Sequence, residues 1–174
     1  MVQSVPIPAA CQLAATQHDA DFADAYEVLV PASARTATEI YRAITRRTPG
    51  WVDKLMWLRN RVVQPFGLKN LGELSEIHPA KPDADYQPGD RVGIFTLFEN
   101  TPDEVLLGDR DKHLDVVLSV FKTVSPDGRS AQVTVTTVVH THNAWGRLYM
   151  LPVAPMHKLI VPAVLKAIGH PARA

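Results

Sequence analysis

RSAQVTVTTVVHTHNAWGRLYMLP, residues 129–152, decides the fold because it joins a long strand directly to a long terminal helix. Its first part, Arg129–Asn143, is dominated by valine and threonine, which favour strands. The chain that follows is apolar and long enough for a terminal helix. Three prolines interrupt it, and each removes a helical hydrogen bond. Asn143 stands at the junction, and we predict that its side chain caps this helix.

More strands precede this stretch. A long strand is predicted over Lys112–Val124, and the SPDG sequence of Ser125–Gly128 that follows it is typical of a hairpin turn. Shorter strands are predicted over Arg91–Glu99 and Glu104–Gly108, joined by the tight connections TPDE and GDRD. The second half of the chain is therefore predicted to be an antiparallel meander of four strands.

The first half combines one strand with two helices. The strand is predicted over Asp24–Val30, and Thr36 with Glu39 three residues later forms a capping box that begins a helix. A second helix is predicted to follow Pro49-Gly50. The apolar residues that share a face are Ala37, Ile40, Tyr41 and Ile44 in the first helix, and Trp51, Leu55, Leu58 and Val62 in the second.

This order of elements predicts the fold class and the domain organisation. A sheet with one apolar face must bury that face against another element, and the terminal helix is the element available to cover it. We predict an α+β fold in which a curved antiparallel sheet wraps around a long C-terminal helix and leaves space between them. Residues 1–22 are predicted to form an arm or loosely docked segment, residues 23–170 a single domain, and Leu68–Asp90 a long loop.

Composition restricts the class of protein. The 174 residues suit one domain, and the 18 basic and 18 acidic residues cancel, so net charge gives no argument for nucleic-acid binding. Eight basic and two acidic residues lie between Arg35 and Lys69, and four basic and eleven acidic between Glu73 and Asp115. This uneven distribution indicates either an anion-attracting face or two solvated faces of opposite sign.

The termini and the cysteine content indicate a compartment. Cys11 is the only cysteine, which excludes an intramolecular disulfide and fits a reducing cytoplasm. The N-terminal sequence lacks the basic and apolar regions of a signal peptide. No run approaches the ~18 apolar residues of a membrane span. We therefore expect a cytoplasmic protein without membrane insertion.

Three histidines form the only arrangement that suggests a metal. His140 and His142 share one face of a strand, as two ligands would. Counted from the SPDG turn, His113 and His140 are equally distant, which predicts that they are cross-strand neighbours. A site built from His113, His140 and His142 is therefore conceivable. Strand parity places the pair on the more polar outer face, however, and we predict no metal and no cofactor.

Two segments resemble a known family. LMWLRNRVVQPFGLK, residues 55–69, and HNAWGRLYMLPVAPMHKLIV, residues 142–161, are similar to DUF2867, a bacterial family of uncharacterised domains. DADFADAYEV, residues 19–28, is also similar, whereas Met156 departs from the aromatic residue expected before the histidine. The resemblance implies a helix-grip fold of the Bet v 1, START and polyketide-cyclase type around an apolar cavity. The family's activity is not established, so no catalytic residue is implied.

The space between sheet and terminal helix predicts the function. We predict a module that binds a small apolar or amphipathic molecule there, since such pockets are mostly apolar with a few orienting polar groups. Trp145 and Tyr149 are expected to lie nearest the ligand. The candidate residues are Trp57, Arg59, Val116, Leu118, Thr137, Thr141, Trp145, Arg147, Tyr149 and His157.

Two alternatives stay open. The first is an enzyme of the cyclase or hydratase type with His157 as general acid or base, because histidine titrates near neutral pH. The second is a domain that docks on a partner protein through its contrast of basic and acidic segments. For the aromatic candidates the ordinary interpretation is core packing, and for Arg59 it is a cap or a pair within the protein.

Overall fold

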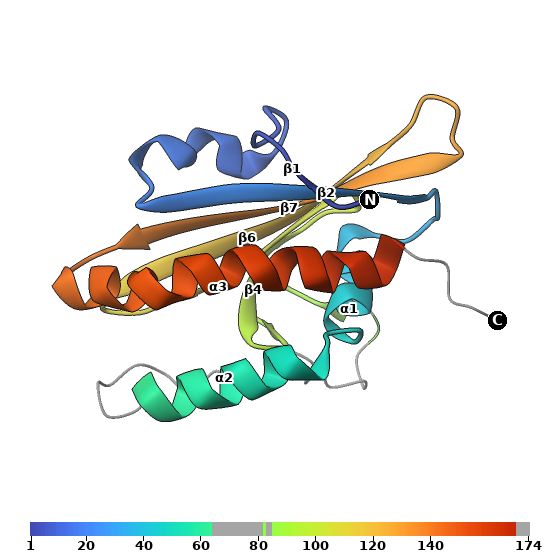
Figure 1. Ribbon diagram of the computed structural model, residues 1–174. Coiled ribbons are helices and arrows are strands. Elements are labelled where there is room, and N and C mark those ends of the chain that lie inside the picture. Colours follow the sequence, from blue (N-terminus) through green and yellow to red (C-terminus); the bar gives the residue numbers. More distant parts are fainter. Residues whose placement is uncertain (64–81, 83–84, 170–174) are drawn as a thin grey trace.

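The protein folds as one seven-stranded antiparallel sheet with a long helix across one face (Figure 1). The computed structural model describes residues 1–63, 82 and 85–169, and the strand order in this part of the chain is β1-β2-β7-β6-β5-β4-β3. The predicted α+β architecture is confirmed. The elements are β1 Gln3–Ser4, η1 Gln12–Ala15, η2 Gln17–Asp19, β2 Phe22–Pro31, α1 Ala37–Thr45, α2 Gly50–Val63, β3 Arg91–Val92, β4 Phe95–Asn100, β5 Glu104–Arg110, β6 Leu114–Val124, β7 Ser130–Thr141 and α3 Ala144–Gly169.

The β6–β7 hairpin forms the centre of the sheet. Its last pair is Val124 with Ala131. In the loop, the Ser125 N–H donates to the Ser130 carbonyl oxygen (2.9 Å) and the Gly128 N–H donates to the Ser125 carbonyl oxygen (2.9 Å). Gly128 has a φ of 67°, a left-handed conformation that suits glycine. The predicted turn is confirmed, but the loop extends two residues beyond SPDG, which changes the register of the two strands.

The two predicted helix caps are confirmed. At the start of α1, Thr36 accepts a hydrogen bond from the Glu39 N–H, and the Glu39 carboxylate accepts one from the Thr36 N–H. At the start of α3, the Asn143 side chain accepts a hydrogen bond from the Gly146 N–H (3.1 Å). Gly146 fits there because a Cβ would stand 2.2 Å from the His113 carbonyl oxygen. This contact fixes the beginning of α3 against the beginning of β6.

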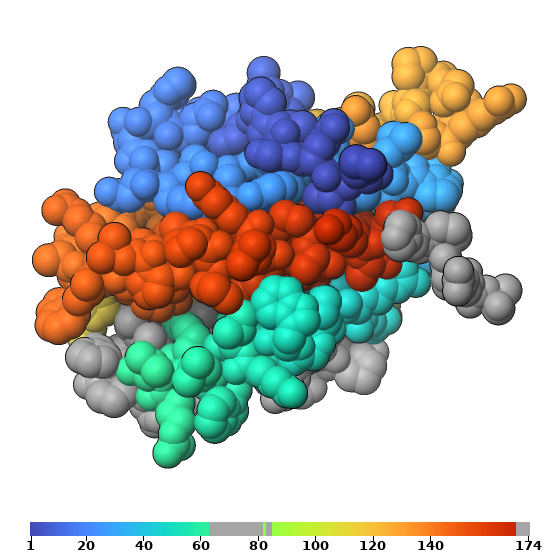
Figure 2. Space-filling view, in the orientation of Figure 1, coloured from blue at the N-terminus to red at the C-terminus, as the bar shows by residue number. Residues whose placement is uncertain are grey.

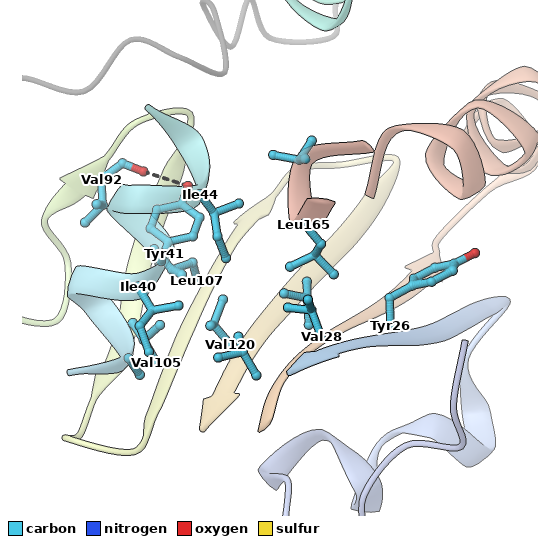
Figure 3. Close-up of a cluster of buried hydrophobic side chains, with 14 of the residues drawn as sticks. Tyr26, Val28, Ile40, Tyr41, Ile44, Val92, Val105, Leu107, Val120 and Leu165 are labelled. Carbon is cyan, nitrogen blue, oxygen red and sulfur yellow. Dashed lines mark hydrogen bonds between the residues drawn. The ribbon is translucent and has the colours of Figure 1, made fainter. Parts of the chain in front are cut away.

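The main hydrophobic core lies between the sheet, α1 and the C-terminal half of α3 (Figure 3). Tyr41 of α1 is fully buried, and its hydroxyl donates to the Val92 carbonyl oxygen (3.2 Å). Leu165 of α3 points towards Val28 of β2 in the same cluster. Burying a side chain of this size contributes about 1.5–3 kcal/mol, so these contacts fasten both helices to the sheet.

A smaller cluster covers the opposite face of the sheet. The segment that carries η1 and η2 packs there, with Cys11 and Leu13 buried against Val138. Next to them the buried carboxylate of Glu104 accepts hydrogen bonds from the Ser119 hydroxyl (2.6 Å) and from the Gln12 N–H (3.2 Å). The N-terminal segment is therefore held on the sheet by apolar packing and by hydrogen bonds to Glu104.

The structure corrects two expectations about the secondary structure. The strand expected over Arg91–Glu99 is divided into β3 and β4, because Gly93 takes a left-handed φ of 63° and turns the chain. The shared face of α2 points to solvent, since Trp51, Leu58 and Val62 are exposed while Val52 is fully buried. The predicted loop Leu68–Asp90 lies largely outside the described residues.

The outer side of α3 is unusually apolar. By length and composition alone this helix could cross a membrane. Sequence reasoning, which expected no apolar run of that length, missed this property. Only 11% of its most apolar window of 18 residues is buried. Among the described residues, the helix thus packs on the sheet along one narrow side, and its apolar residues Trp145, Leu148, Leu151 and Leu159 are exposed.

Candidate functional site

Two polar side chains face α3 from neighbouring strands of the sheet, β2 and β7. In β2, the side chains of Tyr26 and Val28 join the main core, so Asp24, two residues earlier, faces the same way. Asp24 is the cross-strand partner of Thr137 in β7. Cβ atoms of directly opposed residues are about 4.5–5.5 Å apart. The sheet therefore carries a carboxylate and a hydroxyl side by side on the face that meets α3.

His157 reaches this pair from α3. Its Nε2 lies 3.2 Å from Asp24 Oδ1, and the edge of its ring meets Phe22 with the ring centroids 5.5 Å apart. The side chain of His157 is partly shielded and that of Asp24 is almost buried. We call Asp24, Thr137 and His157 the polar trio.

Two atoms of the polar trio lack a partner. Asp24 Oδ2 and Thr137 Oγ1 are buried and have no hydrogen-bond partner in the described part of the chain. A buried polar group that makes no hydrogen bond costs about 1–3 kcal/mol, so buried polar groups are almost always paired. A group from a bound molecule could supply the missing hydrogen bonds.

Apolar side chains that retain access to solvent adjoin the polar trio. Leu118 is opposite Thr137 in the β6–β7 pairing, and Val116 is opposite Val139. Both residues lie on β6, the central strand of the sheet, yet both are only half-buried. The helix-facing side of β6 is thus less covered here than at Val120, which is fully buried.

Arg59 and Tyr149 join α2 to α3. The Arg59 Nε–H donates to the Tyr149 hydroxyl (3.0 Å), and the guanidinium lies 5.4 Å from the centroid of the Tyr149 ring. Arg59 also donates to the Asn60 side chain (2.9 Å). Both predicted candidates are therefore engaged with each other.

Thr141 is occupied by a neighbouring carboxylate. Its N–H and its hydroxyl both donate to Asp21 Oδ2, at 2.6 Å and 2.7 Å. The hydrogen bond from the Thr141 N–H, followed by the one from the hydroxyl, lowers the pKa of Asp21 below its ordinary value of 3.8. This contact ties the end of β7 to the segment before β2.

Replacing Asp21 by asparagine is expected to remove part of the acid dependence of stability. Because the folded-state pKa is lowered, the stabilisation is present above about pH 3.8 and is lost as the pH falls through the folded value. Between pH 5 and pH 2.5 the melting temperature of the Asp21→Asn protein should fall less than that of the wild type. An unchanged slope in thermal melts across this range would contradict the assignment.

The other predicted candidates lie on the outside. Trp57 of α2, and Trp145 and Arg147 of α3, are all exposed. The structure therefore brings together His157, Thr137, Leu118 and Val116. Trp57, Trp145 and Arg147 are not part of this group. Trp145 was expected to lie beside the ligand. Because Trp145 is exposed, a ligand in contact with it would have to lie on the outer side of α3.

The three histidines do not meet as expected. Asp115 lies opposite His140, because the hairpin loop is two residues longer than SPDG, so the predicted pairing of His113 with His140 is wrong. His142 Nε2 lies 3.1 Å from Asp115 Oδ1, and His113 Nδ1 lies 3.2 Å from Asn143 Oδ1. Among the described residues no group of three or more metal-binding side chains is present.

Sequence reasoning missed Asp24, although a signal was present. Phe22, Asp24, Tyr26 and Val28 alternate along one face of a strand, and Asp24 is the single charged residue among them. A carboxylate on an apolar face is expensive unless it has a partner. The alternation therefore pointed to a buried acid with a special role.

Comparison with known proteins gives one match. A family model described as a protein of unknown function (DUF2867) matches residues 16–164, which is most of the chain. No curated protein and no solved structure matches.

Proposed function

The chain belongs to the DUF2867 family, whose function is unknown, and from its geometry we propose that it binds a small amphipathic molecule between the sheet and α3. The observation that carries the proposal is a pair of buried atoms, Asp24 Oδ2 and Thr137 Oγ1, that have no hydrogen-bond partner among the described residues. The fold agrees, since a sheet beneath a long helix can enclose a ligand.

The hydrogen-bonding groups of the polar trio indicate which head group the ligand would carry. Asp24 Oδ2 can only accept a hydrogen bond while it is ionised, and Thr137 can donate or accept. A hydroxyl or a protonated amine satisfies both groups, whereas a carboxylate would face the negative charge of Asp24. We therefore propose a ligand with a hydroxyl or an amine at one end.

The neighbouring strand defines the rest of the ligand. Val116 and Leu118 are apolar and half-buried. Transferring apolar ligand surface onto them gains about 25 cal/mol per Å². An alkyl or alicyclic body attached to the hydroxyl would lie along β6.

Titration with 1-octanol and octanoate tests the proposal. We expect the alcohol to bind at least tenfold more tightly, measured by calorimetry or by NMR shifts. Thr137→Val should weaken octanol binding about tenfold, which is about 1.4 kcal/mol. The same change should leave the melting temperature equal or higher, because it removes a buried hydroxyl that makes no hydrogen bond within the described part of the chain.

Thr134→Val is the matched control. Thr134 is also 3% exposed and belongs to the same strand, but it points to the opposite face of the sheet. This variant should bind octanol like the wild type. Equal affinity for octanol and octanoate, or wild-type affinity in Thr137→Val, would contradict the proposal.

The contact between His157 and Asp24 supports a second candidate, a hydratase-type enzyme. A carboxylate that holds an imidazole fixes the orientation of the ring, and general acid–base catalysis requires a ring held in a fixed position. Incubation with a β-hydroxy ketone, which can lose water, separates the two candidates by mass spectrometry of the products. If the protein is an enzyme, it consumes the ketone, and the rate of this reaction falls at least 100-fold in the His157→Gln variant. If it is a binding protein, the ketone is recovered unchanged.

A further inference from the structure

A second feature, separate from the polar trio, lies on the outside of the molecule. Figure 2 shows α2 and α3 next to each other on one face, and the hydrogen bond between Arg59 and Tyr149 joins them. Most of the exposed large apolar side chains belong to these two helices. We call them the α2–α3 apolar face: Trp51, Trp57, Leu58, Val62, Trp145, Leu148, Leu151 and Leu159.

The apolar residues of α3 follow the period of a helix. Trp145, Leu148, Pro152, Pro155 and Leu159 are spaced by three or four residues, and all are exposed. Residues with this spacing occupy one side of a helix. The other side supplies the residues that fasten α3 to the sheet, so the exposed row has no role in the core.

The charge of these helices is strongly one-sided. Together α2 and α3 contain six basic residues and one acidic residue, 6 − 1 = +5, although the whole chain is neutral. No aspartate or glutamate occurs in α3. Two copies that met through this face would oppose like charges. The basic residues are Lys54, Arg59, Arg61, Arg147, Lys158 and Lys166.

We propose that the α2–α3 apolar face docks on an anionic lipid bilayer, with both helices parallel to its surface. Tryptophan and leucine side chains suit the boundary between headgroups and acyl chains, and lysine and arginine suit the lipid phosphates. Long basic side chains can lie along the apolar face and place their charges at the headgroups. Because α3 remains fastened to the sheet on its other side, it lies on the bilayer and does not cross it.

Intrinsic fluorescence tests this proposal directly. All three tryptophans of the chain, Trp51, Trp57 and Trp145, belong to the α2–α3 apolar face. Vesicles that contain phosphatidylglycerol should shift the emission to the blue and sediment with the protein. Pure phosphatidylcholine vesicles should bind at least tenfold more weakly, and raising the salt concentration should weaken binding to the anionic vesicles.

Two variants at residues of equal exposure distinguish vesicle binding through the α2–α3 apolar face from non-specific hydrophobic binding. Leu148 on α3 is 55% exposed, and Leu29, which faces the other side of the sheet, is 54% exposed. Leu148→Glu should reduce binding to anionic vesicles at least tenfold, whereas Leu29→Glu should bind like the wild type. Circular dichroism of both variants checks that they are folded.

Three results would overturn the proposal. One is wild-type vesicle binding by Leu148→Glu. Another is equal affinity for neutral and anionic vesicles, which would remove the role of the basic residues. The third is an absence of binding to anionic vesicles; dimerisation that Leu148→Glu abolishes in analytical ultracentrifugation would then assign the face to a second copy.

Discussion

Leu165→Ala is expected to lower the free energy of unfolding by about 2–5 kcal/mol, the usual cost of truncating a fully buried leucine. Leu165 is 1% exposed and belongs to the core cluster that contains Val28 and Val120. For a chain of this length each kcal/mol lowers the melting temperature by roughly 2–4 °C. Thermal and urea unfolding both measure the change.

Leu159→Ala is the control for this substitution. Leu159 is in the same helix but is 62% exposed, so the same truncation should change stability by less than about 0.5 kcal/mol. Comparable losses in the two variants would mean that α3 is not fastened to the sheet through Leu165. Because Val164 and Ile160 contact the same cluster, the helix should remain formed in both variants.

Replacing Glu104 by alanine is expected to cost about 2–4 kcal/mol, because it leaves several buried donors without an acceptor. The carboxylate accepts hydrogen bonds from Ser119 Oγ, the Gln12 N–H and Cys11 Sγ. Glu99→Ala is the control, since the bond from Gln12 Nε2 to Glu99 (2.9 Å) is exposed to solvent. Chemical denaturation of the three proteins measures the difference.

The thiol of Cys11 gives an independent readout of the same change. Burial raises the pKa of the Cys11 thiol, and the side chain is 2% exposed, so the folded protein should react slowly with a maleimide. Glu104→Ala loosens the N-terminal segment, and labelling should accelerate at least tenfold. A labelling rate equal to that of the wild type would show that Glu104 does not hold the segment in place.

Local signals in the sequence predicted local structure well. The Thr36–Glu39 capping box and the Asn143 cap depend on residues three apart, and both occur as predicted. The register of β6 and β7 depends on loop length, which SPDG alone does not determine. The Ser125–Ser130 contacts add two residues to the loop and thereby move His113 away from His140.

The candidate site could be predicted only in part. Thr137 and His157 were identified from strand parity and from the terminal helix, and the structure places both next to Asp24. The orientation of α2 could not be read from its sequence, because Trp51 and Val52 are both apolar and only tertiary contacts decide which of them is buried. A helix with apolar residues on both sides has no single preferred face.

The lengths of the outermost strands have a consequence for solubility. In the described part of the chain the sheet ends in β1 and in β3, each only two residues long, while the strand next to β1 has ten residues. Unpaired backbone groups on a long edge strand recruit other chains into fibrils, and short edge strands offer few such groups. Gln3 and Ser4 pair with only two of the ten residues of β2, Glu27 and Tyr26, so proteolytic removal of this segment is expected to leave that edge of β2 open along its length to pairing with another chain.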